Sequence, residues 1–169
     1  MALEGYALRK EVAFTLEAAR IPLRLYLSRR LTVNEEDMGH LRETIRRTQT
    51  GFNVLGDKKN VMMESMFSIA IENTRVHEGF FTEKLIDCMR TYTVPIYYGP
   101  DSVLDIFNPE GIIVVKSAKD INRVLVNLTE RDYWRRLSAM SENYKIAEEY
   151  MDILGRTREL ILREIAWSL

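Results

Sequence analysis

The chain alternates between stretches whose apolar residues recur every three or four positions and short stretches that are apolar throughout or at every second position. The first kind is typical of amphipathic helices, in which such residues share one face. Leu8, Val12 and Leu16 form one such stripe, and Asn34, which precedes several acids, is a predicted N-cap. Helices are predicted over residues 4–19, 34–45, 58–65, 82–92 and 121–128, and from Glu130 to the end with a break at Gly155.

The second kind of stretch predicts strands between these helices. The predicted strands span residues 23–28, 52–56, 66–71, 93–98 and 111–115. The last three are nearly continuous apolar runs, which are typical of strands covered on both faces. Strands that alternate with helices indicate βαβ units and a parallel sheet. The predicted fold is therefore α/β, with a Rossmann-like, mainly parallel sheet of about five or six strands and helices on both faces.

Two polar loops follow predicted strands, at residues 72–79 and 99–105. The carboxyl ends of parallel strands meet at one sheet edge, where α/β proteins bind ligands. The first loop leads into the helix that begins near Thr82, and a helix N-terminus attracts phosphate. Thr82 is suited to cap that helix, Glu83 to accept hydrogen bonds from a ribose, and Lys84 to pair with a diphosphate. The alternative is an ordinary charged first turn, and substitution of a surface residue there would change stability by less than about 0.5 kcal/mol.

Composition narrows the classes of function. The chain has 169 residues, which is enough for one domain with a real core, and its net charge of -1 gives no basic footprint for nucleic acid. One cysteine, Cys88, cannot form an intrachain disulfide, which favours a reducing, cytoplasmic compartment. The N-terminus carries charges where a signal peptide needs an apolar core. No run approaches the roughly 18 to 20 apolar residues of a membrane span.

A longer pattern is more specific than these features. Residues 67–74 read FSIAIENT, and residues 80–99 read FFTEKLIDCMRTYTVPIYYG. This order of an apolar strand ending in Glu-Asn, a short loop, an aromatic residue, Thr-Glu-Lys, a helix and Val-Pro-hydrophobic-Tyr-Tyr-Gly resembles glycosyltransferase family 10, the α1,3/4-fucosyltransferases. The segment DIFNPEGIIVV at residues 105–115 resembles the next part of the family's donor-binding half. The resemblance covers about residues 66–116.

The resemblance implies the C-terminal domain of a GT-B enzyme, which binds GDP-fucose and transfers fucose to a glycan acceptor with inversion. It places Glu83 on the ribose and Lys84 on the diphosphate, which agrees with the roles inferred above from their position at a helix N-terminus. It also places Glu72 near the sugar or its positive transition state. The expected catalytic residue is Glu72, and the expected donor-binding residues are Asn73, Thr82, Glu83, Lys84 and Tyr98. Polar termination of a strand is the alternative for Glu72 and Asn73.

Two departures from the family pattern affect this prediction. GT-B enzymes have two Rossmann-like halves, and the family's catalytic base and acceptor site lie in the N-terminal one. Residues 1–20 are predicted as an N-terminal helix and residues 21–169 as the donor-binding domain, without an acceptor domain. That domain is expected either from a separate chain or from a part of the protein outside these residues. The family's pyrophosphate arginine follows the first strand, where this sequence reads TVNEEDMGH, and Arg29, Arg30 or Arg42 are candidate substitutes. A non-catalytic nucleotide-sugar-binding module and an interaction protein that keeps the fold stay open as alternatives.

The remaining chemistry-bearing residues give weaker signals. His77 lies in the loop before Thr82, where a solvated side chain is the alternative to a ligand contact, and His40 has no evident partner. These histidines lack the spacing of a metal site, so no metal or other cofactor is expected. Cys88 is expected to pack inside a helix. The C-terminal stripe of Leu160, Ile161 and Ile165 with arginines nearby predicts a helix that packs on its own domain or contacts a membrane surface.

Overall fold

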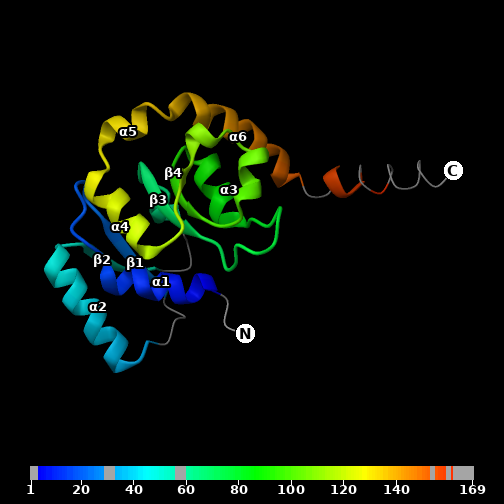
Figure 1. Ribbon diagram of the computed structural model, residues 1–169. Coiled ribbons are helices and arrows are strands. Elements are labelled where there is room, and N and C mark those ends of the chain that lie inside the picture. Colours follow the sequence, from blue (N-terminus) through cyan, green and yellow to red (C-terminus); the bar gives the residue numbers. More distant parts are fainter. Residues whose placement is uncertain (1–3, 29–32, 56–59, 153–154, 159–160, 162–169) are drawn as a thin grey trace.

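The computed structural model describes residues 4–28, 33–55, 60–152, 155–158 and 161 (Figure 1). Its strands are β1 (Arg24–Ser28), β2 (Gly51–Leu55), β3 (Phe67–Ile71), β4 (Val94–Tyr98) and β5 (Ile113–Val114). Its α-helices are α1 (Glu4–Thr15), α2 (Glu35–Thr48), α3 (Glu83–Arg90), α4 (Ala118–Asn127), α5 (Glu130–Trp134) and α6 (Leu137–Met151). Short 3-10 helices are η1 (Asn60–Met62), η2 (Asp101–Asp105) and η3 (Pro109–Gly111).

All strand pairs in the described residues are parallel, which confirms the α/β, Rossmann-like class predicted from the sequence. The strands do not form a single sheet, however. β1 pairs with β2 in one sheet, and β3, β4 and β5 form another in that order. In the larger sheet Ile71 lies opposite Tyr98, and Ile96 lies opposite Ile113, so the carboxyl ends of β3 and β4 are level.

Helices cover both faces of the three-stranded sheet (Figure 1). On one face α3 and α6 contribute Leu85, Met89 and Met140 to a buried cluster. On the other face α1 and α4 bury apolar side chains against β3, β4 and the segment after β5. Successive side chains of a strand point to opposite faces, and accordingly Tyr97 of β4 joins the first cluster while Tyr98 joins the second. Every residue of β4 is buried, as its apolar sequence predicts.

The N-terminal helix is shorter than the predicted span, because another helix takes over its last hydrogen bonds. The Asn122 side-chain amide of α4 donates to the Thr15 carbonyl at 2.8 Å, and its Oδ1 accepts from the Glu17 backbone N–H at 3.1 Å. These bonds satisfy backbone groups that a continuing helix would use. Residues 16–19 therefore leave the helix and lead toward β1.

A second buried asparagine holds the connection between β4 and β5. The Asn108 backbone N–H donates to Asn143 Oδ1 at 2.6 Å, and Asn143 Nδ2 donates to the Asn108 carbonyl at 3.0 Å. Asn143 belongs to α6 and is fully buried. The connection consists of η2 and η3 rather than an α-helix, and α6 packs against η3.

The C-terminal part differs from the predicted single helix with a break at Gly155. The chain turns at Arg135–Arg136 between α5 and α6, and α6 ends at Met151. Asp152 accepts a hydrogen bond from the Gly155 N–H at 2.9 Å, which caps a new helical turn over residues 155–158. The predicted apolar stripe falls largely outside the described residues, at Leu160 and Ile165, although Ile161 is exposed.

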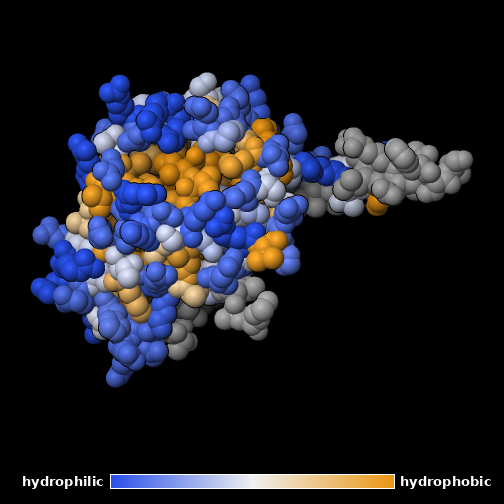
Figure 2. Space-filling model, viewed as in Figure 1, coloured by the Kyte–Doolittle hydropathy of each residue, from blue (hydrophilic) through white to orange (hydrophobic). Residues whose placement is uncertain are grey.

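The surface is uneven in character (Figure 2). Apolar surface gathers below α5 and α6 and above α4, whereas the surface around α2 is mainly hydrophilic in this view. In the part of the chain that the structure describes, no helix combines the length and the hydrophobicity needed to span a membrane.

Candidate functional site

The candidate site lies where β3 and β4 end. Glu72 directly follows β3, and its backbone N–H donates to the Tyr98 carbonyl at 2.7 Å, which extends the pairing with β4 by one residue. The Glu72 side chain is fully buried and its carboxylate points toward the start of α3. There it accepts hydrogen bonds from the Thr82 N–H at 2.8 Å and from the Thr82 hydroxyl at 2.8 Å. Glu72, a predicted site residue, thus lies inside the protein and contacts Thr82, another predicted site residue.

Thr82 is the N-cap of α3, as the sequence predicts. Its Oγ1 accepts from the Lys84 backbone N–H at 3.4 Å and from the Lys84 ammonium at 2.9 Å. The same ammonium lies 3.4 Å from Glu72 Oε2 and 3.9 Å from Glu83 Oε1. Four predicted residues therefore meet at the mouth of one helix. The Glu83 side chain is mainly exposed, with 58% of its surface accessible, and that of Lys84 is 29% accessible.

These contacts change two sequence-based expectations. The Thr82 N–H and the Lys84 N–H already have oxygen acceptors, and the Leu85 N–H donates to the Thr82 carbonyl. An anion at this helix would therefore meet the Lys84 ammonium rather than a row of free amides. Lys84 is also the partner of a buried carboxylate, so its removal is expected to cost stability, unlike that of an ordinary surface residue.

Asn73 faces a different element. Its Oδ1 accepts a hydrogen bond from Arg9 of α1 at 2.9 Å, and the same guanidinium donates to the Ile71 carbonyl. The Asn73 carbonyl accepts from the Gly5 N–H at 3.1 Å. A Cβ on Gly5 would lie 1.9 Å from the Glu72 carbonyl oxygen, so glycine is what permits α1 to approach the strand end so closely. The sequence does not predict Arg9 as a site residue, because its partner lies 64 positions away.

Arg75 is the second guanidinium at the strand ends, and it lies in the loop predicted to face a ligand. Its Nε donates to the Gly99 carbonyl at 3.2 Å, and it forms an ion pair with Asp101 at 3.2 Å. The guanidinium also lies over the Tyr98 ring, 5.2 Å from the ring centre. Burial, followed by the Glu4 carboxylate, raises the pKa of Tyr98. The sequence analysis did not identify Arg75 as a site residue, although an arginine in the loop after a predicted strand could have indicated it.

Tyr98 is therefore buried beneath Arg75 on the α1 face of the sheet, away from the face on which α3 packs. Tyr97 points to the α3 face, and its hydroxyl is buried without a hydrogen-bond partner among the described residues. Burial, and then the Glu72 carboxylate, raise the pKa of Tyr97. A Cβ on Gly99 would lie 2.1 Å from the Tyr97 hydroxyl, so this glycine leaves room for that phenol.

The other candidates lie away from these contacts or pack elsewhere. Arg42 lines an apolar groove between α2 and the β1–β2 sheet, while Arg29 and Arg30 lie outside the described residues. His77 is exposed, and His40 lies 5.3 Å from the Phe14 ring. Cys88 is buried as expected, and burial raises its pKa to about 12. Among the residues that the structure describes, no three His, Cys, Asp or Glu side chains are grouped to hold a metal ion.

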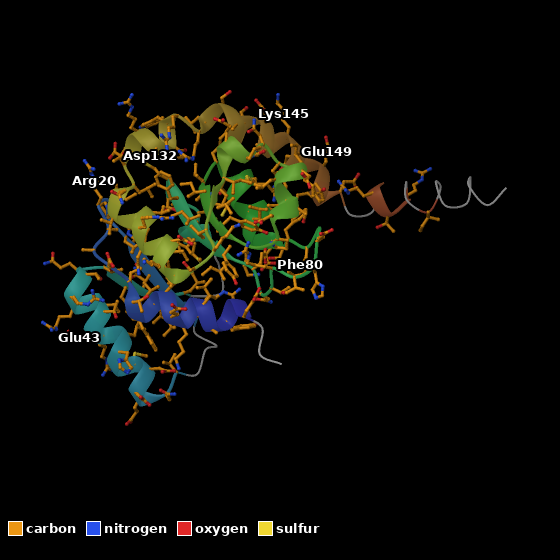
Figure 3. The ribbon with its side chains drawn as sticks, in the orientation of Figure 1. Arg20, Glu43, Phe80, Asp132, Lys145 and Glu149 are labelled. Carbon is orange, nitrogen blue, oxygen red and sulfur yellow. The ribbon has the colours of Figure 1, made fainter. Side chains whose placement is uncertain are left out.

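Figure 3 labels residues from different parts of the molecule, of which Phe80 lies nearest to the start of α3 in the sequence. Phe80 lies in the loop before α3, to the right of the centre of the view, whereas Lys145 lies on α6 at the top. Asp132 and Arg20 lie on the left, near α5 and the end of α4. The contacts of Glu72 with Thr82, and of Thr82 with Lys84, lie at the edge of the three-stranded sheet where β3 ends.

Comparison with known proteins gives the family of the chain. Residues 40–152, more than half of the chain, match the family model described as "Glycosyltransferase family 10 (fucosyltransferase) C-term". The chain belongs to glycosyltransferase family 10. Family 10 relatives include the alpha-(1,3)-fucosyltransferase FucT of Helicobacter pylori, 34% identical over 79 residues, and the alpha-(1,4)-fucosyltransferase of Arabidopsis thaliana, 31% identical over 103 residues.

These family 10 relatives are much longer than the matched region. The match covers 47% of this chain and 16% of the H. pylori protein, and 55% of this chain and 25% of the A. thaliana protein. No solved structure matches the chain significantly. The family-matched region spans α3 and the three-stranded sheet, and hence the contacts among Glu72, Thr82 and Lys84.

Proposed function

We propose that this family 10 chain is the donor-binding part of a fucosyltransferase, which binds GDP-fucose at the carboxyl ends of β3 and β4. Lys84 would pair with the diphosphate, Glu83 would accept hydrogen bonds from the ribose, and Asn73 would lie close to the donor. The observation that carries the proposal is the position of Glu83 and Lys84 in the first turn of α3, next to the strand ends, within the family-matched region. Ligands of open α/β sheets bind at this edge.

Arg75 supports the same proposal from the other side of the strand ends. The family pattern expects a pyrophosphate arginine after β1, where Arg29 and Arg30 lie outside the described residues, whereas Arg75 and Arg9 both lie at the end of β3. A guanidinium suits phosphate because it presents several donors in a planar fork. Arg75 is held by one carbonyl and by an exposed aspartate, and could exchange that surface ion pair at little cost.

Transfer of fucose to a glycan, with inversion, would also require an acceptor-binding half, in the same chain or in another. General-base catalysis is typically worth about 10² to 10⁴ in rate, and an acceptor must be positioned as well. We therefore expect these 169 residues alone to transfer fucose poorly or not at all. A non-catalytic nucleotide-sugar-binding module is the second candidate, favoured by the full burial of Glu72, the residue that was expected to be catalytic.

Titration calorimetry with GDP and GDP-fucose tests the proposal. We expect both ligands to bind the unmodified chain, and Lys84→Met to weaken both by about 1.5 to 3 kcal/mol, the value of a charged hydrogen bond. Glu83→Ala should also weaken both, through the ribose. Lys145→Met, a change to an exposed lysine on α6, is the matched control and should leave binding unchanged. Equal affinities of all four proteins would exclude this site.

A further inference from the structure

The Glu72 carboxylate is the one fully buried acidic side chain among the described residues. An ionised carboxylate costs several kcal/mol to bury unless charge and hydrogen bonds compensate it. Compensation here comes from one element, the start of α3, through the Thr82 N–H, the Thr82 hydroxyl and the Lys84 ammonium. The positive end of the helix dipole acts in the same direction. The contact therefore ties the end of β3 to the first turn of α3.

The same contact restrains Lys84. Its ammonium has the Thr82 hydroxyl at 2.9 Å, Glu72 Oε2 at 3.4 Å and Glu83 Oε1 at 3.9 Å. A free lysine side chain loses up to about 2 kcal/mol of conformational entropy when a ligand fixes it. Lys84 has lost part of that freedom before any ligand arrives, while 29% of its side chain stays accessible. Such preorganisation raises affinity without adding a contact to the ligand.

The position of Glu72 also argues against a direct contact with a sugar. None of its side-chain surface is accessible, and both carboxylate oxygens accept from Thr82. A group that stabilises a transition state has to face the place where charge develops. Exchange of these internal partners for a ligand would leave the Thr82 N–H buried without an acceptor, at a cost of about 1 to 3 kcal/mol.

We propose that Glu72 is a positioning residue, which holds the Lys84 ammonium at the mouth of α3 for an incoming diphosphate and does not itself contact the sugar. This inference rests on the proposed function for the identity of the ligand. The contact among Glu72, Thr82 and Lys84 stands independently of it. Glu72 then acts through Lys84, and its removal should affect the diphosphate part of a ligand and spare the nucleoside part.

The test compares GDP, inorganic pyrophosphate and guanosine on wild type, Glu72→Gln, Lys84→Met and the double variant. Glutamine keeps an oxygen for the Thr82 N–H but loses the charge that holds Lys84. We expect Glu72→Gln to weaken GDP and pyrophosphate by about tenfold, as the loss of one preordered side chain implies, and to leave guanosine unchanged. In the double variant the loss should equal that of Lys84→Met alone. Glu149→Gln, an equal change of charge on an exposed residue of α6, is the control.

Other outcomes distinguish failure of the positioning role from failure of the proposed function. If Glu72→Gln weakens guanosine as much as GDP, or adds fully to Lys84→Met, the positioning role is wrong while the donor site stands. If wild type binds pyrophosphate and not GDP, the proposed function fails, and loss of pyrophosphate in Glu72→Gln still supports positioning. If wild type binds neither, both proposals fail.

A second pair of variants covers the case in which Glu72→Gln does not fold. Thr82→Val removes the hydroxyl that joins Lys84 to Glu72, whereas Thr82→Ser keeps it. We expect Thr82→Val to weaken pyrophosphate several-fold and Thr82→Ser to restore most of the loss. Equal binding by the valine and serine variants would overturn the inference.

Discussion

The two sheets of the molecule differ sharply in how they are packed. In the β3–β4–β5 sheet, every residue of β4 is buried, and α3 with α6 and α1 with α4 cover the two faces. In the β1–β2 sheet, β2 is almost wholly exposed, and Val54 keeps 57% of its surface accessible. The contacts of the candidate site all belong to the first sheet and its helices. A ligand site needs residues held by a rigid scaffold, and only the better packed sheet supplies one among the described residues.

The largest expected difference between the two sheets is in their local stability. Amide protons of β4 should exchange with solvent only in events that approach global unfolding, which for a domain costs about 5 to 15 kcal/mol. Amide protons of β2 should exchange through local openings that cost several kcal/mol less, because few buried side chains hold that strand. Hydrogen exchange of the whole chain, resolved by residue, measures both. Equal protection of the β2 and β4 amides from exchange would show that the difference in burial does not produce a difference in local stability.

A matched pair of substitutions tests the same contrast at the level of side chains. Val94 of β4 is fully buried, whereas Val54 of β2 is mainly exposed. Val94→Ala removes two buried methyl groups and leaves a cavity, so we expect a loss of about 2 kcal/mol in the free energy of unfolding. Val54→Ala should change it by less than about 0.5 kcal/mol. Urea denaturation decides, and a comparable loss in both variants would mean that β2 is covered in solution.

The packing contrast also explains what the sequence could predict. β3 and β4 are short apolar runs in which nearly every side chain is at least half buried, so their sequence alone identifies them. The Thr82 cap is likewise local, because the Lys84 N–H, from which its side chain accepts, lies two residues away. The contact between Asn73 and Arg9 joins residues 64 positions apart, and Asn122 ends α1 from 107 positions away. No local pattern encodes such partners.

Glu72 shows the same limit in the candidate site. The family resemblance implies that Glu72 lies near the sugar, and polar termination of a strand is the alternative that its position alone allows. The structure surrounds it instead with Thr82 and Lys84, residues that the same motif supplies. The residue types of the site were thus predictable from the sequence, but the direction in which Glu72 points was not, because tertiary contacts set it. Its catalytic role stays a prediction, with the positioning role as the competing one.

The smallest expected effect concerns pH and again separates the packed region from the exposed one. Cys88 lies on α3 within the cluster between that helix and the sheet, and burial raises its pKa to about 12. In the unfolded chain a thiol titrates near pH 8.5. Between these values the folded state keeps a proton that the unfolded state releases, so the free energy of unfolding falls as pH rises through this window.

The expected slope is about 1.4 kcal/mol per pH unit once the unfolded thiol has titrated. Denaturation of wild type and Cys88→Ala, from about pH 7 to about pH 10, isolates this contribution, because the alanine variant lacks the group. The buried phenols of Tyr97 and Tyr98 act in the same direction, since their pKa values are also raised, but they contribute mainly above about pH 10. Parallel pH profiles of the two proteins would mean that the thiol reaches solvent in the folded state. The α3 side of the sheet would then be no better packed than β2, and the comparison between the two regions would fail.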